Sequence, residues 1–74
     1  MGLPLLQQGS SGQIVRNWQG LLNAAGRKCA IDGKFGPGTT ALTKEWQAAA
    51  RVPGGADGKV GPATWGRMLG ATVR

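Results

Sequence analysis

The 74-residue sequence contains no histidine and only one cysteine, Cys29. A single cysteine cannot form an internal disulfide, and a zinc site built from cysteine and histidine is excluded. Without a histidine base, neither Cys29 nor a serine has the partner that activates a nucleophile. The sequence therefore argues against catalysis by this chain, and we expect no metal and no cofactor. Its core is expected to pack around three tryptophans and one phenylalanine.

Acidic residues are scarce as well. Three Asp and Glu stand against nine Lys and Arg, which gives a net charge of +6 and a pI of about 11.0. This balance favours an acidic partner, and nucleic acid, anionic lipid and acidic cell-wall polymers all qualify. The positive residues are scattered, however, and only Arg27 and Lys28 are adjacent. Scattered charges favour an ordinary solvated surface over the basic stripe of a nucleic-acid-binding protein.

Long apolar runs are also absent. No stretch approaches the roughly 20 apolar residues of a membrane-spanning helix. The N-terminal MGLPLLQQ lacks the charged start and the unbroken apolar run of a signal peptide. We therefore expect no membrane partner, and no export route is visible in the sequence.

The sequence does contain a repeated motif. Residues 32–40 read DGKFGPGTT and residues 57–65 read DGKVGPATW, with six identical positions of nine and an offset of 57 − 32 = 25. In each copy we expect the aspartate to accept backbone N–H groups and the following glycine to take a positive φ. The next apolar residue, Phe35 or Val60, is expected to anchor the turn in the core. Gly-Pro then begins a helix, because proline at the first helical position loses no hydrogen bond.

Three apolar stripes at helical spacing accompany these motifs. The first helix is predicted to begin with Ser10 as N-cap and Gln13 as its capping-box partner, and to end at Gly26. The second is predicted to end before residues 53–55 and the third at Gly70. The stripes are Val15, Trp18, Leu22 and Ala25; Leu42, Trp46 and Ala49; and Trp65, Met68 and Leu69. The predicted fold class is all-α, a compact three-helix domain with two pseudo-symmetric DGxxGPxT loops.

Two chemical roles for Asp32 and Asp57 were tested against this pattern. A calcium-binding EF-hand needs several oxygen side chains at alternate positions and a closing glutamate, whereas each loop has one aspartate. A pair of glycosidase carboxylates needs environments that separate the two pKa values, but these two have nearly identical neighbours. A structural role in the turns is therefore expected for both residues.

Taken in order, these motifs resemble the peptidoglycan-binding domain family. The matching pieces are Gly9, Gly12, Val15, Trp18-Gln19, Leu22-Asn23, Gly26, the two DGxxGPxT loops, Trp46-Gln47 and Leu69. The resemblance runs from about Pro4 to Leu69 and predicts a domain over residues 4–70, with residues 1–3 an N-terminal extension and 71–74 a C-terminal tail.

The resemblance implies a non-catalytic module that holds a cell-wall hydrolase, such as a phage endolysin or an autolysin, on bacterial peptidoglycan. It implies a location in the cell wall, and we expect a monomer with no nucleic-acid partner. The ligand stays open between the glycan, the stem peptide and a teichoic polymer. The alternative is a small basic nucleic-acid-binding or protein-interaction domain, which would need its cations gathered on one helix face.

Ligand-binding residues are expected where the loops present polar groups beside an aromatic ring. The six candidates are Lys34, Thr39, Asp57, Lys59, Thr64 and Trp65. The two lysines are expected to reach stem-peptide carboxylates. Asp57 and Thr64 are expected to bond peptide amides, and Trp65 to stack on the ligand.

Overall fold

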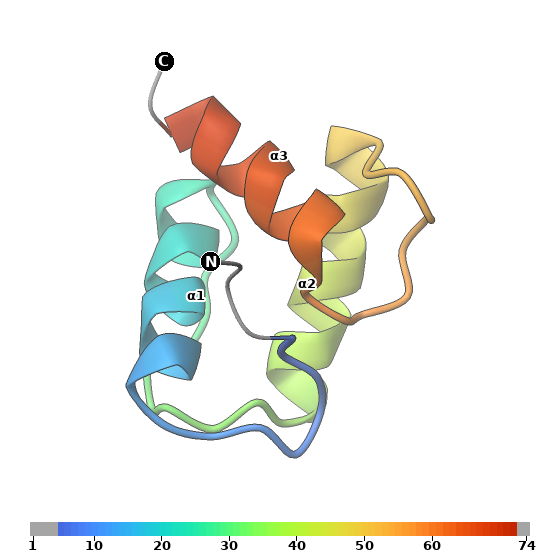
Figure 1. Ribbon diagram of the computed structural model, residues 1–74. Helices are drawn as coiled ribbons and strands as arrows, with labels where there is room; N and C mark the ends of the chain where they lie inside the picture. Colours follow the sequence, from blue (N-terminus) through green and yellow to red (C-terminus); the bar gives the residue numbers. More distant parts are fainter. Residues whose placement is uncertain (1–4, 73–74) are drawn as a thin grey trace.

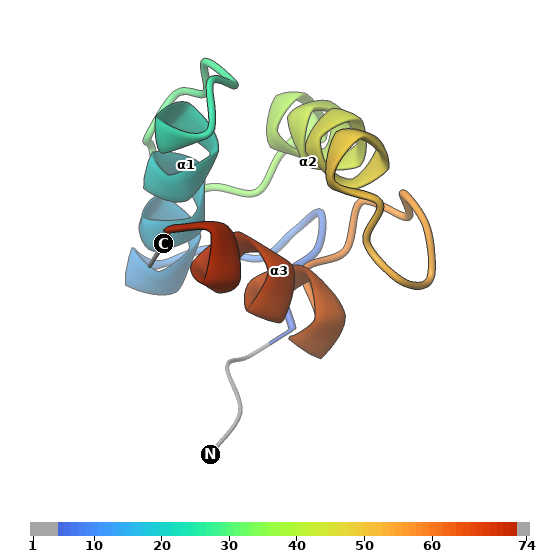
Figure 2. The ribbon, with the colours of Figure 1, turned by 90° about the horizontal axis from the view of Figure 1, so that it is seen from above.

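Three helices surround one core in the computed structural model, which describes residues 5–72 (Figure 1). They are α1 (Gln13–Ala24), α2 (Pro37–Ala50) and α3 (Pro62–Thr72). Helices α1 and α2 stand side by side, and α3 lies across both, as the view from above also shows (Figure 2). The predicted all-α, three-helix fold is confirmed. Within the described residues, no helix has the length and apolar character needed to cross a membrane.

The repeated motif begins α2 and α3 as predicted. Gly36 is the N-cap of α2 and Pro37 its first residue, and α3 begins at Pro62 in the same way. The carbonyls of Gly36 and Gly61 each accept a first-turn N–H, from Thr40 and Trp65 respectively, at 2.9 Å. Proline needs no acceptor for its nitrogen at this position, so the Gly-Pro pair starts a helix from either loop.

The start of α1 differs from the prediction. Its N-cap is Gly12 rather than Ser10, and no side chain caps the helix. The Ser10 hydroxyl instead accepts the Gln7 N–H at 3.1 Å. The reason is a backbone pairing with the first copy of the repeated motif. Gly12 N donates to Gly33 O at 2.9 Å, which keeps the chain extended up to residue 12. The helix begins only after this pairing ends, so the predicted capping box is wrong.

The helix ends match the predictions in part. Gly26 takes φ 88 directly after α1, as expected for a C-terminal glycine. Helix α2 ends through Arg51, which adopts a left-handed conformation at φ 54, and the Arg67 guanidinium donates to its carbonyl at 3.2 Å. The prediction that Gly70 ends α3 is wrong, because the helix continues to Thr72. A glycine weakens a helix without forcing it to stop.

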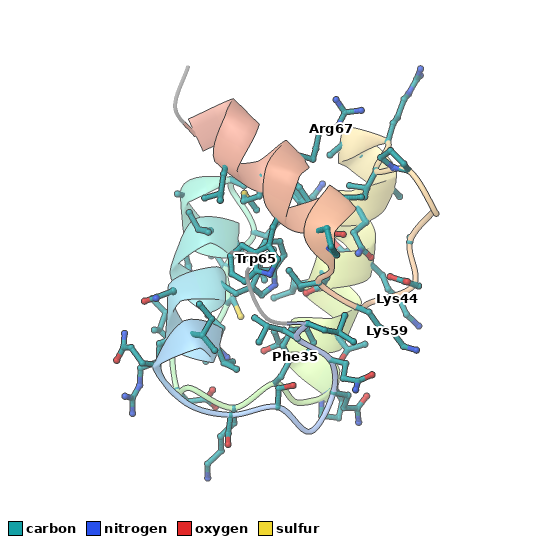
Figure 3. The ribbon with its side chains drawn as sticks, in the orientation of Figure 1. Phe35, Lys44, Lys59, Trp65 and Arg67 are labelled. Carbon is teal, nitrogen blue, oxygen red and sulfur yellow. The ribbon has the colours of Figure 1, made fainter. Side chains whose placement is uncertain are left out.

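The core is centred on Trp18, which is completely buried. Its ring meets those of Trp46 and Trp65 edge-on, with centroids 5.7 and 5.4 Å apart. Its Nε1 donates to Thr43 Oγ1 at 3.0 Å, so the one polar atom of the ring is satisfied. Figure 3 shows Trp65 directed from α3 into the centre of the domain. Ala49 and Leu69 of the predicted stripes lie instead on the exposed side of their helices, and Ala25 is the exposed C-cap residue just after α1.

Two isolated antiparallel bridges attach the N-terminal segment to the turns. One joins Leu6 to Val60 and the other joins Ser11 to Lys34. Leu6, Phe35 and Val60 are all buried, which confirms that an apolar residue anchors each turn in the core. The N-terminal segment therefore holds both repeated turns in place before α1 begins.

Candidate ligand-binding site

The first repeated turn is organised by Gln19, a completely buried residue of α1. Its amide nitrogen lies 3.0 Å from Asp32 Oδ1, 3.0 Å from the Lys34 carbonyl and 3.1 Å from Thr39 Oγ1. Its amide oxygen accepts the Gly33 N–H at 2.9 Å. One side chain thus fixes the turn and the first residues of α2 relative to α1.

The second repeated turn has the same arrangement around Gln47 of α2. The amide nitrogen lies 3.3 Å from Asp57 Oδ1, 2.8 Å from the Lys59 carbonyl and 3.0 Å from Thr64 Oγ1. The amide oxygen accepts the Gly58 N–H at 2.9 Å. Every contact of Gln19 has its counterpart, so the internal repeat extends from the sequence motif to a complete hydrogen-bond network.

Glutamine suits this position because it presents a donor and an acceptor on one planar group. Sequence reasoning noted a Trp-Gln pair in both helices but gave the glutamines no role. The helices repeat at an offset of 47 − 19 = 28 positions, whereas the turns repeat at 25, which conceals the relation. The sequence signal for their role is that Trp-Gln precedes DGxxGPxT in both halves of the chain.

The turns themselves follow the prediction. Asp32 Oδ1 accepts the Lys34 N–H at 2.9 Å, and Asp57 Oδ1 accepts the Lys59 N–H at the same distance. The glycine between them needs a positive φ, as seen at Gly58 with φ 78. A Cβ atom at Gly58 would also lie 2.9 Å from the Thr40 methyl group, so both conformation and space require glycine there.

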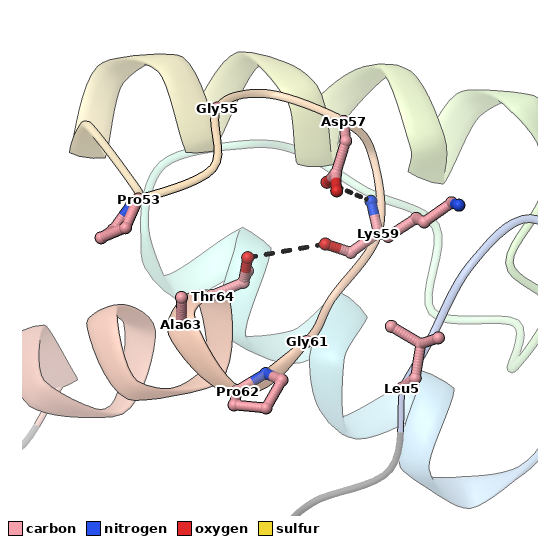
Figure 4. Close-up of a pocket in the computed structure, with 9 residues that line it drawn as sticks. All are labelled: Leu5, Pro53, Gly55, Asp57, Lys59, Gly61, Pro62, Ala63 and Thr64. Atoms are coloured by element: carbon pink, nitrogen blue, oxygen red, sulfur yellow. Dashed lines mark hydrogen bonds between the residues drawn. The ribbon is translucent and has the colours of Figure 1, made fainter.

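A hollow opens beside each turn, at the start of the helix that follows. We name the hollow beside residues 32–39 the first hollow and that beside residues 57–64 the second hollow. Both are lined by the Asp, Lys, Gly, Pro and Thr of their DGxxGPxT motif. The first also has Lys28, Cys29 and Leu42, and the second has Leu5, Pro53 and Gly55, as shown in the close-up of the second hollow (Figure 4). Their volumes are about 400 and 160 Å³ respectively.

The structure divides the six candidate residues between the two hollows. Lys34 and Thr39 line the first hollow, and Asp57, Lys59 and Thr64 line the second. The lysines and Asp57 are exposed, so they are available to a ligand. Thr39 and Thr64 are 6% and 4% exposed, and each hydroxyl is bonded to its glutamine.

The expectation that Trp65 presents an exposed ring is wrong. Only 4% of its surface is accessible, and its ring packs edge-on against Trp18. Its position in the first turn of α3 places it on the inner side of the helix, directly after the buried Thr64. Trp65 is therefore part of the core and is not among the residues that line the second hollow.

The hydrogen bonds of the first turn also affect its carboxylate. The side-chain hydrogen bond from Gln19 and the backbone N–H of Lys34 lower the pKa of Asp32 below its ordinary value of 3.8. Bonding of this kind stabilises the charged form, so Asp32 is ionised at neutral pH. No cluster of three or more potential metal ligands occurs among the described residues.

Cys29 is half-buried, and its Sγ lies 3.6 Å from Thr39 Oγ1 beside the first hollow. The Asn23 side chain holds this segment by donating to the Cys29 carbonyl at 2.8 Å and accepting its N–H at 3.2 Å. The Asn23 side chain therefore fixes the connection between α1 and α2, which forms one wall of the first hollow.

These features define a class: a three-helix domain in which two glutamine-organised turns each support a surface hollow. Residues 11–68 match the family described as "Putative peptidoglycan binding domain". The chain belongs to this family.

Known relatives agree with this assignment. The chain is 41% identical over 66 residues to the zinc D-Ala-D-Ala carboxypeptidase of Streptomyces albus G, a match that covers 85% of this chain and 25% of that protein. It resembles the crystal structure of a Burkholderia AP3 phage endolysin, with a TM-score of 0.84, 33% identity and coverage of 92% of this chain and 26% of the endolysin chain.

The crystal structure of the SleB N-terminal domain is similar over its whole extent. The TM-score is 0.85 at 31% identity, and the match covers 93% of each chain. By contrast, the chain spans about a quarter of the length of the carboxypeptidase and of the endolysin. The fold therefore occurs both as a part of a longer carboxypeptidase and a longer endolysin and as an N-terminal domain of similar size.

Proposed function

We propose that this chain is a peptidoglycan-binding module with no catalytic activity of its own. The observation that carries the proposal is the match of residues 11–68 to the peptidoglycan-binding family. The internal repeat supports it, because two hydrogen-bond networks of the same design hold two solvent-facing hollows open. The Asp32 and Asp57 carboxylates are bound into their turns, which suits a structural role better than catalysis.

The module acts in the cell wall and holds a wall hydrolase on its substrate. This part of the proposal rests on the relatives, since an endolysin and a D-Ala-D-Ala carboxypeptidase contain the same domain within longer chains. Attachment raises the effective concentration of an enzyme at its polymeric substrate without any new catalytic group. We expect the module to be a monomer when it is not bound to the wall.

Within the module, the exposed members of the two hollows contact the ligand. These are Lys34 in the first hollow, and Asp57 and Lys59 in the second. Thr39 and Thr64 serve the same sites by bonding the glutamines that fix the turns, whereas Trp65 packs in the core. The charged side chains at these hollows suit short polar branches of a polymer.

The test is a pulldown on purified sacculi freed of protein and teichoic acids. A salt concentration of about 0.3 M suppresses non-specific charge contacts, which matters for a chain with net charge +6. We expect the wild-type chain to be retained under these conditions. If it washes through while still binding DNA or teichoic acid at low salt, charge alone explains its binding and the proposal is wrong.

Matched variants locate the site. Gly38 and Ala63 occupy equivalent exposed positions of the two hollows, and a Cβ on Gly38 would meet nothing within 4 Å. Gly38→Trp is expected to fill the first hollow and Ala63→Trp the second. Gly66→Trp adds the same ring to an exposed, open position of α3 outside both hollows. Loss of retention in the first two variants but not in the third places binding in the hollows; equal retention of all three places it elsewhere.

A further inference from the structure

At each of the two turns, a cation from the preceding helix lies against the glycine that precedes the turn's own lysine. In the second turn, the stem of Lys44 from α2 lies against the buried Gly58, where an added Cβ would be 3.1 Å from Lys44 Cε. The next residue in the chain is Lys59, which is exposed like Lys44. Figure 3 shows both lysines extending outward on the same side of the domain.

The first turn has the same arrangement with an arginine. The side chain of Arg16 from α1 lies against the buried Gly33, where an added Cβ would be 3.1 Å from Arg16 Nε. Lys34 follows directly and is exposed. Arg16 and Lys44 are 44 − 16 = 28 positions apart, which is the offset of the two glutamines, so the helix cation is part of the internal repeat. We name these two sets the first and the second cation pair.

One carboxylate lies beside each of these pairs, Asp32 at the first turn and Asp57 at the second. Glu45 is 3.5 Å from Arg27 and forms the ion pair found among the described residues. Asp32 and Asp57 lie in the turns themselves, but one oxygen of each is bonded to backbone N–H and to glutamine. Each turn thus holds two cations against one carboxylate, and the excess positive charge attracts an incoming anion.

We infer that the first and second cation pairs bind carboxylates of the peptidoglycan stem peptide, one pair at each turn. The inference rests on the proposed function and names the chemical group that is recognised. Peptidoglycan offers two kinds of surface: a glycan of neutral rings and short peptides with free carboxylates. Ammonium and guanidinium groups are matched to the second kind, and two adjacent cations can hold one carboxylate from both sides.

The experiment compares two preparations of teichoic-free sacculi, one untreated and one with its carboxyl groups converted to neutral methylamides. The proteins are the wild type, Arg16→Met, Lys44→Met and Arg51→Met. Methionine keeps an apolar stem over the glycine of the turn and removes the charge. Arg51 lies seven residues after Lys44, just past the C-terminal end of α2 and about 10 Å from Lys44 along the helix axis, so Arg51→Met changes the net charge equally at a position outside the pairs. Circular dichroism verifies that each variant is folded.

We expect the wild type to bind methylamidated sacculi at least tenfold more weakly than untreated sacculi. Arg16→Met and Lys44→Met should each lose at least threefold in affinity for untreated sacculi, with little change on methylamidated ones. Arg51→Met should match the wild type on both. Equal binding of the wild type to both preparations, or equal losses for Lys44→Met and Arg51→Met, overturns the inference. A wild type that fails to bind untreated sacculi overturns the proposed function instead.

Discussion

Replacing Gln47 by glutamate tests the hydrogen-bond network that forms the second turn. The change is nearly isosteric, but it exchanges the amide nitrogen for a second oxygen. That oxygen would face Asp57 Oδ1 and the Lys59 carbonyl, at the positions where the amide nitrogen now lies 3.3 and 2.8 Å away. Gln47→Glu therefore converts donor contacts into repulsive ones without changing the volume of the core.

The expected loss follows from the contacts. The amide nitrogen has two N–H groups to share among its three acceptors, so two hydrogen bonds are lost at about 1 kcal/mol each, which gives about 2 kcal/mol before any cost of burying a charge. A carboxylate in this nearly inaccessible position adds to that loss, since its oxygens cannot all find donors. A domain of this length has a free energy of unfolding of roughly 4–11 kcal/mol, so the variant should retain little stability.

Urea unfolding, followed by the fluorescence of the three buried tryptophans, measures the difference. Gln7→Glu is the matched control, because Gln7 is exposed and the change of charge is the same. The equivalent variant of the first turn, Gln19→Glu, should lose a similar amount. If Gln47→Glu costs less than about 1 kcal/mol while Gln7→Glu is neutral, the amide does not organise the turn and the reasoning is refuted.

Three further outcomes can be measured by thermal or urea unfolding. Gly58→Ala should destabilise the domain by at least about 1 kcal/mol, because Gly58 has a positive φ and an added Cβ would lie 2.9 Å from the Thr40 methyl group. Gly20→Ala should stabilise it by up to about 1 kcal/mol, because Gly20 lies within α1 with open space around it. Changes in the free energy of unfolding of the same sign for these two variants would contradict this reasoning. The lowered pKa of Asp32 means that its contribution to stability is present above pH 3.8 and is lost as the pH falls below it, so Asp32→Asn should flatten the stability curve in that acid range. An unchanged slope would contradict the role of its hydrogen bonds. Trp18→Phe should cost about 2–4 kcal/mol through the lost core volume and the lost bond to Thr43, and a loss below about 1 kcal/mol would show that Trp18 is not the centre of the core.

The features that the sequence predicted correctly are local. Gly-Pro begins a helix through the geometry of proline alone, and Asp-Gly makes a turn through bonds within three residues. The starts of α2 and α3 and the inward anchors Phe35 and Val60 needed no knowledge of the rest of the chain. The Ser10 capping box failed because a long-range pairing of Gly12 with Gly33 competes with it. A local capping preference is not realised where the backbone already forms a long-range hydrogen bond.

The candidate site was predictable only in its polar part. Lys34, Asp57 and Lys59 follow from the turn pattern and are exposed. Trp65 was misplaced because the side of a short helix that faces the core depends on how α3 crosses the other two helices. The roles of Gln19 and Gln47 depend on bringing a helix against a turn 13 or 10 residues later. The approach of Arg16 and Lys44 to the turns also depends on how each helix packs against its turn, so it could not be predicted from the sequence.

The bridge between Leu6 and Val60 has a consequence for the order in which the chain folds. Each glutamine network closes over a short stretch of sequence, and such contacts form quickly. Leu6 and Val60 are separated by 60 − 6 = 54 residues, yet they exchange two backbone bonds, of 3.0 and 2.7 Å. Closing so long a loop costs more conformational entropy than either network does. The two turns are therefore expected to form as separate early units, and the N-terminal segment to join them late, when the second turn is in place to receive it.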